Sequence, residues 1–268
     1  MTPRDIGLFL MSARTDATIA RLGATNGARA AFEAVYSRWN DTWASASPRY
    51  RYQRRKYEQV VGMLSGRRFR RGLDLGCGLG LLAQLLAPQV DELLGLDIAE
   101  AAIDRARQRE AAFPNLRYEQ ADLLDLPRTL DRSFDLVLVV NTLYYLSPLD
   151  DETLKGMALR VADLIVPGGL CVLVNHYFFA ADSASRISRR MHRTFSQSLR
   201  FRLTREQRKP FFWPADQAVG PRGCRRQGGM RARLQTIDVS ITLTGTLAMP
   251  IRRTHKDGHD HQHCCCSE

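Results

Sequence analysis

Residues 73–80 read Leu-Asp-Leu-Gly-Cys-Gly-Leu-Gly, a short apolar run that enters three glycines spaced at every second position. Glycine lets the backbone turn sharply and approach a ligand closely, so the run predicts a buried strand, a ligand-binding turn and a following helix. The last glycine comes one position too early for the dinucleotide-binding spacing, and no lysine follows as a P-loop requires. Asp74 lies two positions before the first glycine, Gly76.

Outward from this loop, short apolar runs alternate with amphipathic stretches. We predict strands at 72–76, 93–97, 116–121, 134–140 and 170–175, with helices at 79–86, 99–112 and 151–165. Apolar strands that alternate with helices are typical of a parallel sheet covered on both faces. The expected fold class is α/β, a doubly wound, mostly parallel seven-stranded sheet with an N-terminal helical extension.

Carboxylates follow three successive predicted strands. Asp74 belongs to the first, Asp97 ends the second and Asp122 follows the third. The carboxyl ends of parallel strands form the usual ligand crevice of an open α/β sheet, where an acid can accept hydrogen bonds from ribose hydroxyls. Such a floor repels a pyrophosphate and favours a cationic, adenosine-bearing ligand.

In this order the segments resemble class I S-adenosylmethionine-dependent methyltransferases. The resemblance rests on LDLGCGLG (73–80), GLDIAEAAIDRA (95–106), EQADLLDLP (119–127), FDLVLVVNTLYYL (134–146) and VPGGLCVLV (166–174). It implies S-adenosyl-L-methionine as cofactor, with the glycine loop around its methionine and ribose, Asp97 on the ribose and Asp122 at the adenine. The residues it assigns to the cofactor are Asp74, Gly76, Cys77, Gly78, Gly80, Asp97, Ile98, Asp122, Leu123 and Asn141.

A looser resemblance concerns the acceptor. Residues 41–61 (DTW-x4-PRYRYQRRKYEQVV), together with LYYL at 143–146, are similar to the nodulation protein S group, which N-methylates an amino sugar. This implies a small-molecule acceptor, with an amine on a sugar or glycan as the first candidate. Two alternatives stay open: an RNA or protein methyltransferase recruited by basic flanks, and a non-catalytic protein that binds S-adenosylmethionine.

Three residues are candidates for catalysis. Asn141 and Tyr144 have the N-x-x-Y spacing of some amino-methyltransferases, in which the Asn orients the amine and the Tyr stacks on it, although the two intervening prolines are absent. His176 follows the last predicted parallel strand and suits a base near neutrality. Asn141 could instead contact the methionine end of the cofactor, and His176 could be a hydrogen-bonded structural residue.

The chain has 268 residues and a net charge of +11, with 44% hydrophobic residues, enough for a full core. The positive charge lies on either side of residues 71–180, which carry 9 basic and 16 acidic side chains, so a polyanion close to the predicted cofactor crevice is disfavoured. We expect no membrane span, free thiols and a cytoplasmic protein. The His/Cys tract at 255–266 lacks the separated pairs of a structural zinc site, so no metal is expected.

We predict three parts: an N-terminal helical lid (1–66), the methyltransferase domain (67–213) and a basic, poorly ordered tail (214–268). Residues 1–25 show weak periodicity and are expected to be frayed. Residues 28–44 predict a helix with Phe32, Tyr36, Trp39 and Trp43 on one face, and 52–64 a second helix. Residues 199–203 and 210–213 could form a closing hairpin. The acceptor atom, the base and the oligomeric state do not follow from the sequence.

Overall fold

The computed structural model describes residues 3–108, 110–146, 150–176, 183–210 and 237–245. They form one sheet in the order β3-β2-β1-β4-β5-β7-β6. The first five strands run parallel, and β7 pairs antiparallel with both β5 and β6. The predicted α/β class and the mostly parallel sheet are confirmed.

The parallel strands are the buried centre of the fold. They span β1 Phe69–Leu75, β2 Val90–Asp97, β3 Leu116–Gln120, β4 Phe134–Val140 and β5 Ile165–His176. The middle of β4 is inaccessible from either face, as expected for a strand covered by layers on both sides. Asp74 pairs with Gly95 of β2 and with Leu138 of β4, so the residues after it emerge at the carboxyl edge of the sheet centre.

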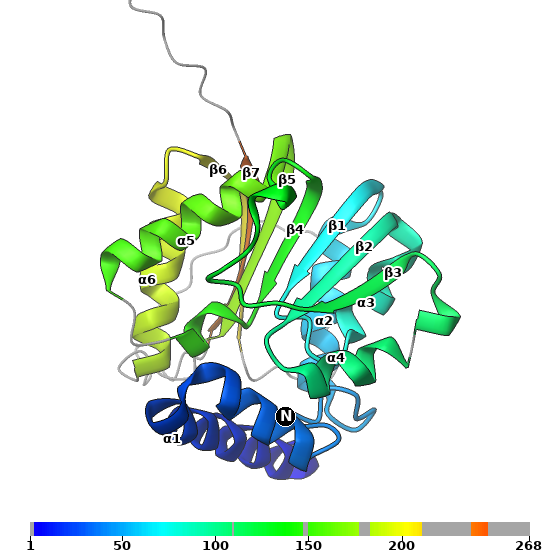
Figure 1. The fold of residues 1–268 in the computed structure, drawn as a ribbon, viewed down its shortest axis with the longest axis vertical. Coiled ribbons are helices and arrows are strands. Elements are labelled where there is room, and N and C mark those ends of the chain that lie inside the picture. Colours follow the sequence, from blue (N-terminus) through cyan, green and yellow to red (C-terminus); the bar gives the residue numbers. More distant parts are fainter. Residues whose placement is uncertain (1–2, 109, 147–149, 177–182, 211–236, 246–268) are drawn as a thin grey trace, which may run out of the picture.

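One N-terminal helix, α1, lies across this carboxyl edge, and the other, α2, packs on a face of the sheet beside α3 (Leu81–Leu86) with its first turns at the cavity (Figure 1). α1 runs from Pro3 to Arg38 with a break at Gly27 (φ 82°), and α2 from Arg51 to Leu64. The prediction for residues 1–25 was therefore wrong from Pro3 onward. The helix predicted over 28–44 ends at Arg38, so Trp39 is 40% exposed instead of sharing one helical face with Trp43.

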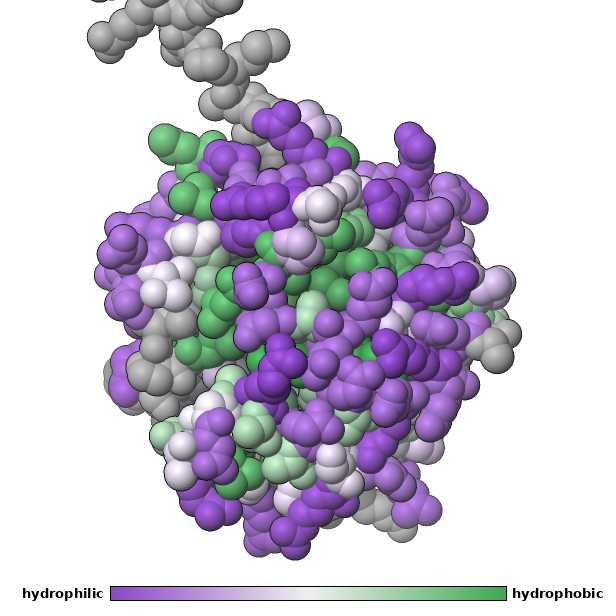
Figure 2. Space-filling view, viewed as in Figure 1, coloured by the Kyte–Doolittle hydropathy of each residue, from purple (hydrophilic) through white to green (hydrophobic). Residues whose placement is uncertain are grey.

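Helices cover the rest of the sheet unevenly. The remaining α-helices are α3 Leu81–Leu86, α4 Glu100–Arg107, α5 Asp151–Leu164 and α6 Ser183–Gln197. Residues 121–133, which connect β3 to β4, contain only the 3-10 turn η3, Arg128–Leu130. Apolar side chains are visible on the sheet face that this connection crosses (Figure 2); Leu124 on the connection is 55% exposed.

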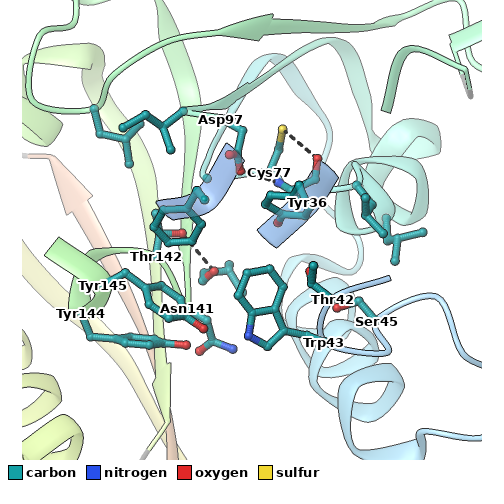
Figure 3. A pocket seen from close by; sticks show the side chains of 18 of the residues that line it. Tyr36, Thr42, Trp43, Ser45, Cys77, Asp97, Asn141, Thr142, Tyr144 and Tyr145 are labelled. Atoms are coloured by element: carbon teal, nitrogen blue, oxygen red, sulfur yellow. Dashed lines mark hydrogen bonds between the residues drawn. The ribbon is translucent and has the colours of Figure 1, made fainter. Parts of the chain in front are cut away.

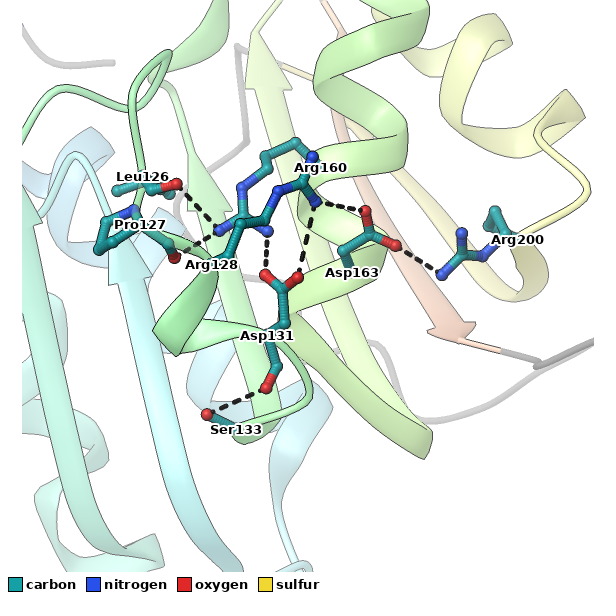
Figure 4. A network of polar contacts seen from close by, with 8 residues as sticks. All are labelled: Leu126, Pro127, Arg128, Asp131, Ser133, Arg160, Asp163 and Arg200. Atoms are coloured by element: carbon teal, nitrogen blue, oxygen red, sulfur yellow. Dashed lines mark hydrogen bonds and ion pairs between the residues drawn. The ribbon is translucent and has the colours of Figure 1, made fainter.

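A polar network fastens the β3–β4 connection to α5 and to the segment after α6 (Figure 4). Arg160 of α5 donates hydrogen bonds to Asp131 and to the carbonyls of Leu126 (3.1 Å) and Pro127 (2.8 Å). Asp163, one turn further along α5, accepts from Arg128 (3.2 Å) and Arg200 (2.8 Å). These bonds hold the irregular connection where another α/β protein would place a helix.

The last two strands differ from the predicted hairpin. β6 is one strand, Phe201–Pro210, and β7, Ile237–Gly245, lies between β5 and β6. The sheet thus extends beyond the boundary predicted at residue 213. The His/Cys tract lies outside the described residues. None of the described helices is long and apolar enough to cross a bilayer.

Candidate functional site

The glycine loop is fixed to the neighbouring strand β2. Gly76, Gly78 and Gly80 all have positive φ, at 76°, 53° and 71°. The amides of Gly76 and Cys77 donate to the carbonyl of Leu96, at 2.7 and 2.9 Å. The Gly78 amide donates to Asp97 Oδ2 at 2.9 Å. The carboxylate at the end of β2 therefore holds the loop as well as facing the cavity.

Gly76 is also required by close packing. A Cβ at this position would come within 2.3 Å of Thr142 Cγ2. Thr142 is itself held in place by hydrogen bonds. Its hydroxyl lies at donor distance from two carbonyl oxygens, that of Leu75 at 2.8 Å and that of Val140 at 3.1 Å. The turn after β1 and the turn after β4 therefore touch, and only glycine fits between them.

Two buried carboxylates lie under the loop. Asp74 is 2% exposed and Asp97 7%. Burial, followed by the charge of Asp97, raises the pKa of Asp74 to about 7. Burial also raises the pKa of Asp97, against the lowering effect of its hydrogen bonds from the Ala99 and Gly78 amides. A bound cation would favour the ionised form of both groups.

At the other end of the cavity, β4 ends in Asn141, which has φ 55°. Its Oδ1 is buried without a hydrogen-bond partner among the described residues. Tyr144 and Tyr145 lie beside it, and Trp43 packs near Tyr145 at the same end of the cavity (Figure 3). An unpartnered buried oxygen is costly, so it marks a place for a donor from a ligand.

Asp16 of α1 joins the lid to this end of the cavity. Its Oδ1 accepts hydrogen bonds from Trp43 Nε1 at 2.7 Å and from the Tyr145 hydroxyl at 2.6 Å. Burial raises the pKa of Asp16, and these two bonds and the charge of Lys56 oppose the shift. The sequence analysis missed Asp16; an acid on an otherwise weakly periodic helix gave no signal.

One cavity brings most of the predicted residues together. Its lining includes the predicted Gly76, Cys77, Gly78, Asp97, Ile98, Asp122, Leu123, Asn141 and Tyr144. Asp74 and Gly80 are outside the lining, Asp74 beneath the floor and Gly80 at the start of α3. His176 is the last residue of β5, and its side chain is not among those described. Sequence reasoning also missed three polar lining residues of the lid, Thr42, Gln53 and Lys56.

The residues present fit S-adenosylmethionine. The glycine loop lies at the cavity with no room for a side chain at Gly76 or Gly78, and the buried acids suit a ligand that carries positive charge. Asp97 would hold the ribose, with Ile98 and Leu123 beside the base. Asp122 faces the cavity while its Oδ1 accepts from the Leu124 amide at 2.9 Å, which fixes the orientation of its carboxylate.

Comparison with known proteins agrees with this geometry. Residues 73–169 match the family described as Methyltransferase domain. The chain is 32% identical over 146 residues to a ubiquinone biosynthesis O-methyltransferase of Alkalilimnicola ehrlichii, covering 52% of this chain and 55% of that protein. A second, from Acinetobacter baumannii, is 26% identical over 153 residues, 56% of this chain and 60% of that protein. The chain thus spans little more than half the length of these curated relatives.

A solved structure with a similar fold covers more of the chain. It is the N-methyltransferase NodS from Bradyrhizobium japonicum WM9 in complex with S-adenosyl-L-homocysteine, with a TM-score of 0.58 and 19% identity. The match covers 80% of this chain and 97% of NodS. The chain therefore carries a class I S-adenosylmethionine-dependent methyltransferase domain, whose fold resembles that of NodS.

Proposed function

We propose that the protein transfers a methyl group from S-adenosylmethionine to a small-molecule acceptor, and that the acceptor atom is an amine nitrogen, first of all on a sugar or glycan. The observation that carries the proposal is a single cavity with Asp97 and the glycine loop at one end and the unpartnered Oδ1 of Asn141 at the other. The likeness to NodS supports the amine, and the curated relatives support a small acceptor.

When bound, the cofactor supplies a methyl group already activated by its sulfonium charge. The chain's own residues then have to position the acceptor and keep water out. Asn141 Oδ1 would accept an N–H of the neutral amine, which leaves the nitrogen lone pair directed at the methyl group. Tyr144 would stack on the acceptor. His176, at the end of β5, is our candidate for receiving the proton that the amine loses.

A second candidate is O-methylation of a phenol. It is favoured by the two O-methyltransferase relatives and by the aromatic side chains around Asn141. A phenol would have to ionise in the cavity, where the carboxylates of the floor oppose a new negative charge. We therefore place the amine first. We also expect a cytoplasmic location, where the buried thiols Cys77 and Cys171 stay reduced.

The test incubates the full chain with methyl-labelled cofactor and separate pools of amino sugars and chitooligosaccharides, phenols, and RNA. We expect label in the amine pool, with kcat/KM reduced about 100-fold in Asn141→Ala, roughly the loss of a hydrogen bond to the reacting group. The affinity for S-adenosylhomocysteine should change less than about threefold, because the missing oxygen serves the acceptor. Label only in RNA, or in no pool, would contradict the proposal.

A further inference from the structure

The acceptor end of the cavity is walled by aromatic rings and backed by a buried acid. We propose that Phe32, Trp43, Tyr144 and Tyr145, with Asp16 behind them, form a subsite for an N-alkylated ammonium group. The inference rests on the proposed function and deepens it, because it assigns the acceptor to amines whose methylated forms are cations.

The rings come from three separate segments and meet at Tyr145. Its ring centroid lies 5.3 Å from that of Phe32, 5.9 Å from Trp43 and 4.3 Å from Tyr144. All four residues line the cavity, and Figure 3 shows Trp43 at the same end of it as the two tyrosines and Asn141. Aromatic faces attract alkylammonium groups through the ring quadrupole, and several rings together are the usual way of recognising quaternary ammonium ligands.

The charged side chains around the cavity also favour a cationic group over a neutral one. Asp41, Asp97 and Asp122 line it, against one basic residue, Lys56. Asp16 stands behind the rings, held by Trp43 Nε1 and the Tyr145 hydroxyl. Lys56 of α2 faces Asp16 and donates a hydrogen bond to Gln53, so it partly offsets this acid. Negative charge near a desolvated cation stabilises it, and Asp16 is the acid that contacts the rings of this subsite directly.

The subsite explains how the cavity could hold an amine before and after methylation. A primary amine offers N–H groups to Asn141 Oδ1, but each added methyl removes one of them. A quaternary nitrogen has no N–H left, and its binding then depends on the rings and on nearby negative charge. Binding of the acceptor therefore depends increasingly on the aromatic rings as methylation removes the N–H groups that Asn141 Oδ1 could accept.

The test uses choline and 3,3-dimethyl-1-butanol, in which carbon replaces the charged nitrogen at nearly the same shape. Each is titrated calorimetrically into the full chain saturated with S-adenosylhomocysteine, whose own affinity is measured first. We expect choline to bind at least about tenfold more tightly than the alcohol, the selectivity expected of a desolvated cation–π site. Trp43→Leu should weaken choline binding about 5- to 30-fold, with the alcohol changed much less.

Two further variants distinguish a specific effect of the Asp16 charge or the Trp43 ring on choline binding from a general loss of folding. Asp16→Asn keeps an oxygen for Trp43 and Tyr145 but removes the charge, so it should weaken choline only. Trp39→Leu is the matched control, because Trp39 is 40% exposed and outside the cavity lining. Melting temperature and S-adenosylhomocysteine affinity report folding, and Tyr144→Leu replaces Trp43→Leu if that variant unfolds.

Three results would overturn the inference. Choline and the alcohol could bind equally, or the Trp43 and Tyr144 variants could leave choline binding unchanged. Choline could also displace S-adenosylhomocysteine, which would assign the rings to the cofactor's sulfonium. If the wild-type chain does not bind S-adenosylhomocysteine at all, that result contradicts the proposed function itself, and it is distinguishable from the three results above.

Discussion

Two sets of buried or half-buried acids in this molecule have opposite surroundings. Asp74 and Asp97, under the glycine loop, have no basic residue among the groups that shift their pKa values, which burial raises. Asp131 and Asp163 lie on and beside the β3–β4 connection and are paired with arginines. Burial raises the pKa of Asp131 as well, but the hydrogen bond and charge of Arg160 outweigh it, so the pKa is lowered.

The difference separates binding from structural support. An acid already paired with arginine has its charge compensated, so it stabilises the fold. Burying an acid without a cation beside it costs folding free energy. A cationic ligand that binds close to the acid can offset this cost. Asp74 and Asp97 belong to the second class, and the predictions below compare the two regions.

The largest effect is expected at Gly76. Gly76→Ala would place its Cβ 2.3 Å from Thr142 Cγ2 at a positive φ, so the loop has to move. We expect the affinity for S-adenosylhomocysteine to fall at least about 100-fold by calorimetry, and the unfolding free energy to fall by about 2–4 kcal/mol.

Gly66→Ala is its matched control. Gly66 has the same φ of 76° but nothing within 4 Å of a Cβ. We expect a small loss of stability, about 1 kcal/mol, and unchanged affinity for S-adenosylhomocysteine. Equal affinities in the two variants would show that the loop geometry does not govern cofactor binding.

The next effect belongs to the arginine network. The Arg160 side chain is 15% exposed, and Arg160→Met removes the donor to two carbonyls and leaves Asp131 with only its 3.5 Å ion pair to Arg128. Urea unfolding should show a loss of about 2 kcal/mol. Arg128→Met, at a side chain 73% exposed, should lose less than about 1 kcal/mol. Neither variant should alter the affinity for S-adenosylhomocysteine. A loss of affinity in Arg160→Met would show that the arginine network also contributes to cofactor binding, which contradicts the separation of the two regions.

A smaller effect is the pH dependence due to Asp74. Its pKa of about 7 exceeds the ordinary value of 3.8 for an aspartate, so the folded protein holds the proton to higher pH than the unfolded chain. The stability of the wild-type protein therefore falls as the pH rises through this interval. Because the sulfonium cation of S-adenosylmethionine favours the ionised form, the affinity for S-adenosylmethionine should rise up to about tenfold between about pH 6 and pH 8.

Asp74→Asn should remove both dependences. Compared with wild type, it should gain stability as the pH rises, and its affinity should be flat over the same range. Asp131 has the opposite sign: the stability that it contributes is present above its unfolded pKa and is lost as the pH falls through its lowered folded pKa. A wild-type affinity that does not vary with pH would contradict the assignment to Asp74.

The cofactor end could be predicted because its signals are local. A strand, three glycines and an acid at the end of the next strand are each visible in a few residues, and parallel pairing brings them together. At the acceptor end Asn141 and Tyr144 could be predicted from their local spacing, but Asp16 could not, since it meets Trp43 across 27 positions and Tyr145 across 129. No periodicity encodes such a contact.

Helix ends and the sheet edge were the other misses. The pattern of Phe32, Tyr36, Trp39 and Trp43 continued past Arg38, where the helix stops. Asp41 there accepts hydrogen bonds from the amides of Ser45 (2.7 Å) and Ala46 (3.0 Å) and holds a turn instead. This turn brings Trp43 into the cavity while Trp39 stays exposed. The weak alternation over residues 234–247 indicates a strand, and β7 lies there, but the predicted domain ended at residue 213 because the resemblance ended before it.

The most direct test of the cofactor site is a calorimetric titration of S-adenosylhomocysteine into wild type and Asp97→Asn. Asp91→Asn is the control, an acid on the same strand that pairs with Arg68 at the far end of the sheet. Asp97→Asn removes the charge that holds the Gly78 amide and, in our account, the ribose, so the affinity should fall about 100-fold. Asp91→Asn should bind like wild type. Equal affinity of Asp97→Asn and wild type would contradict the account.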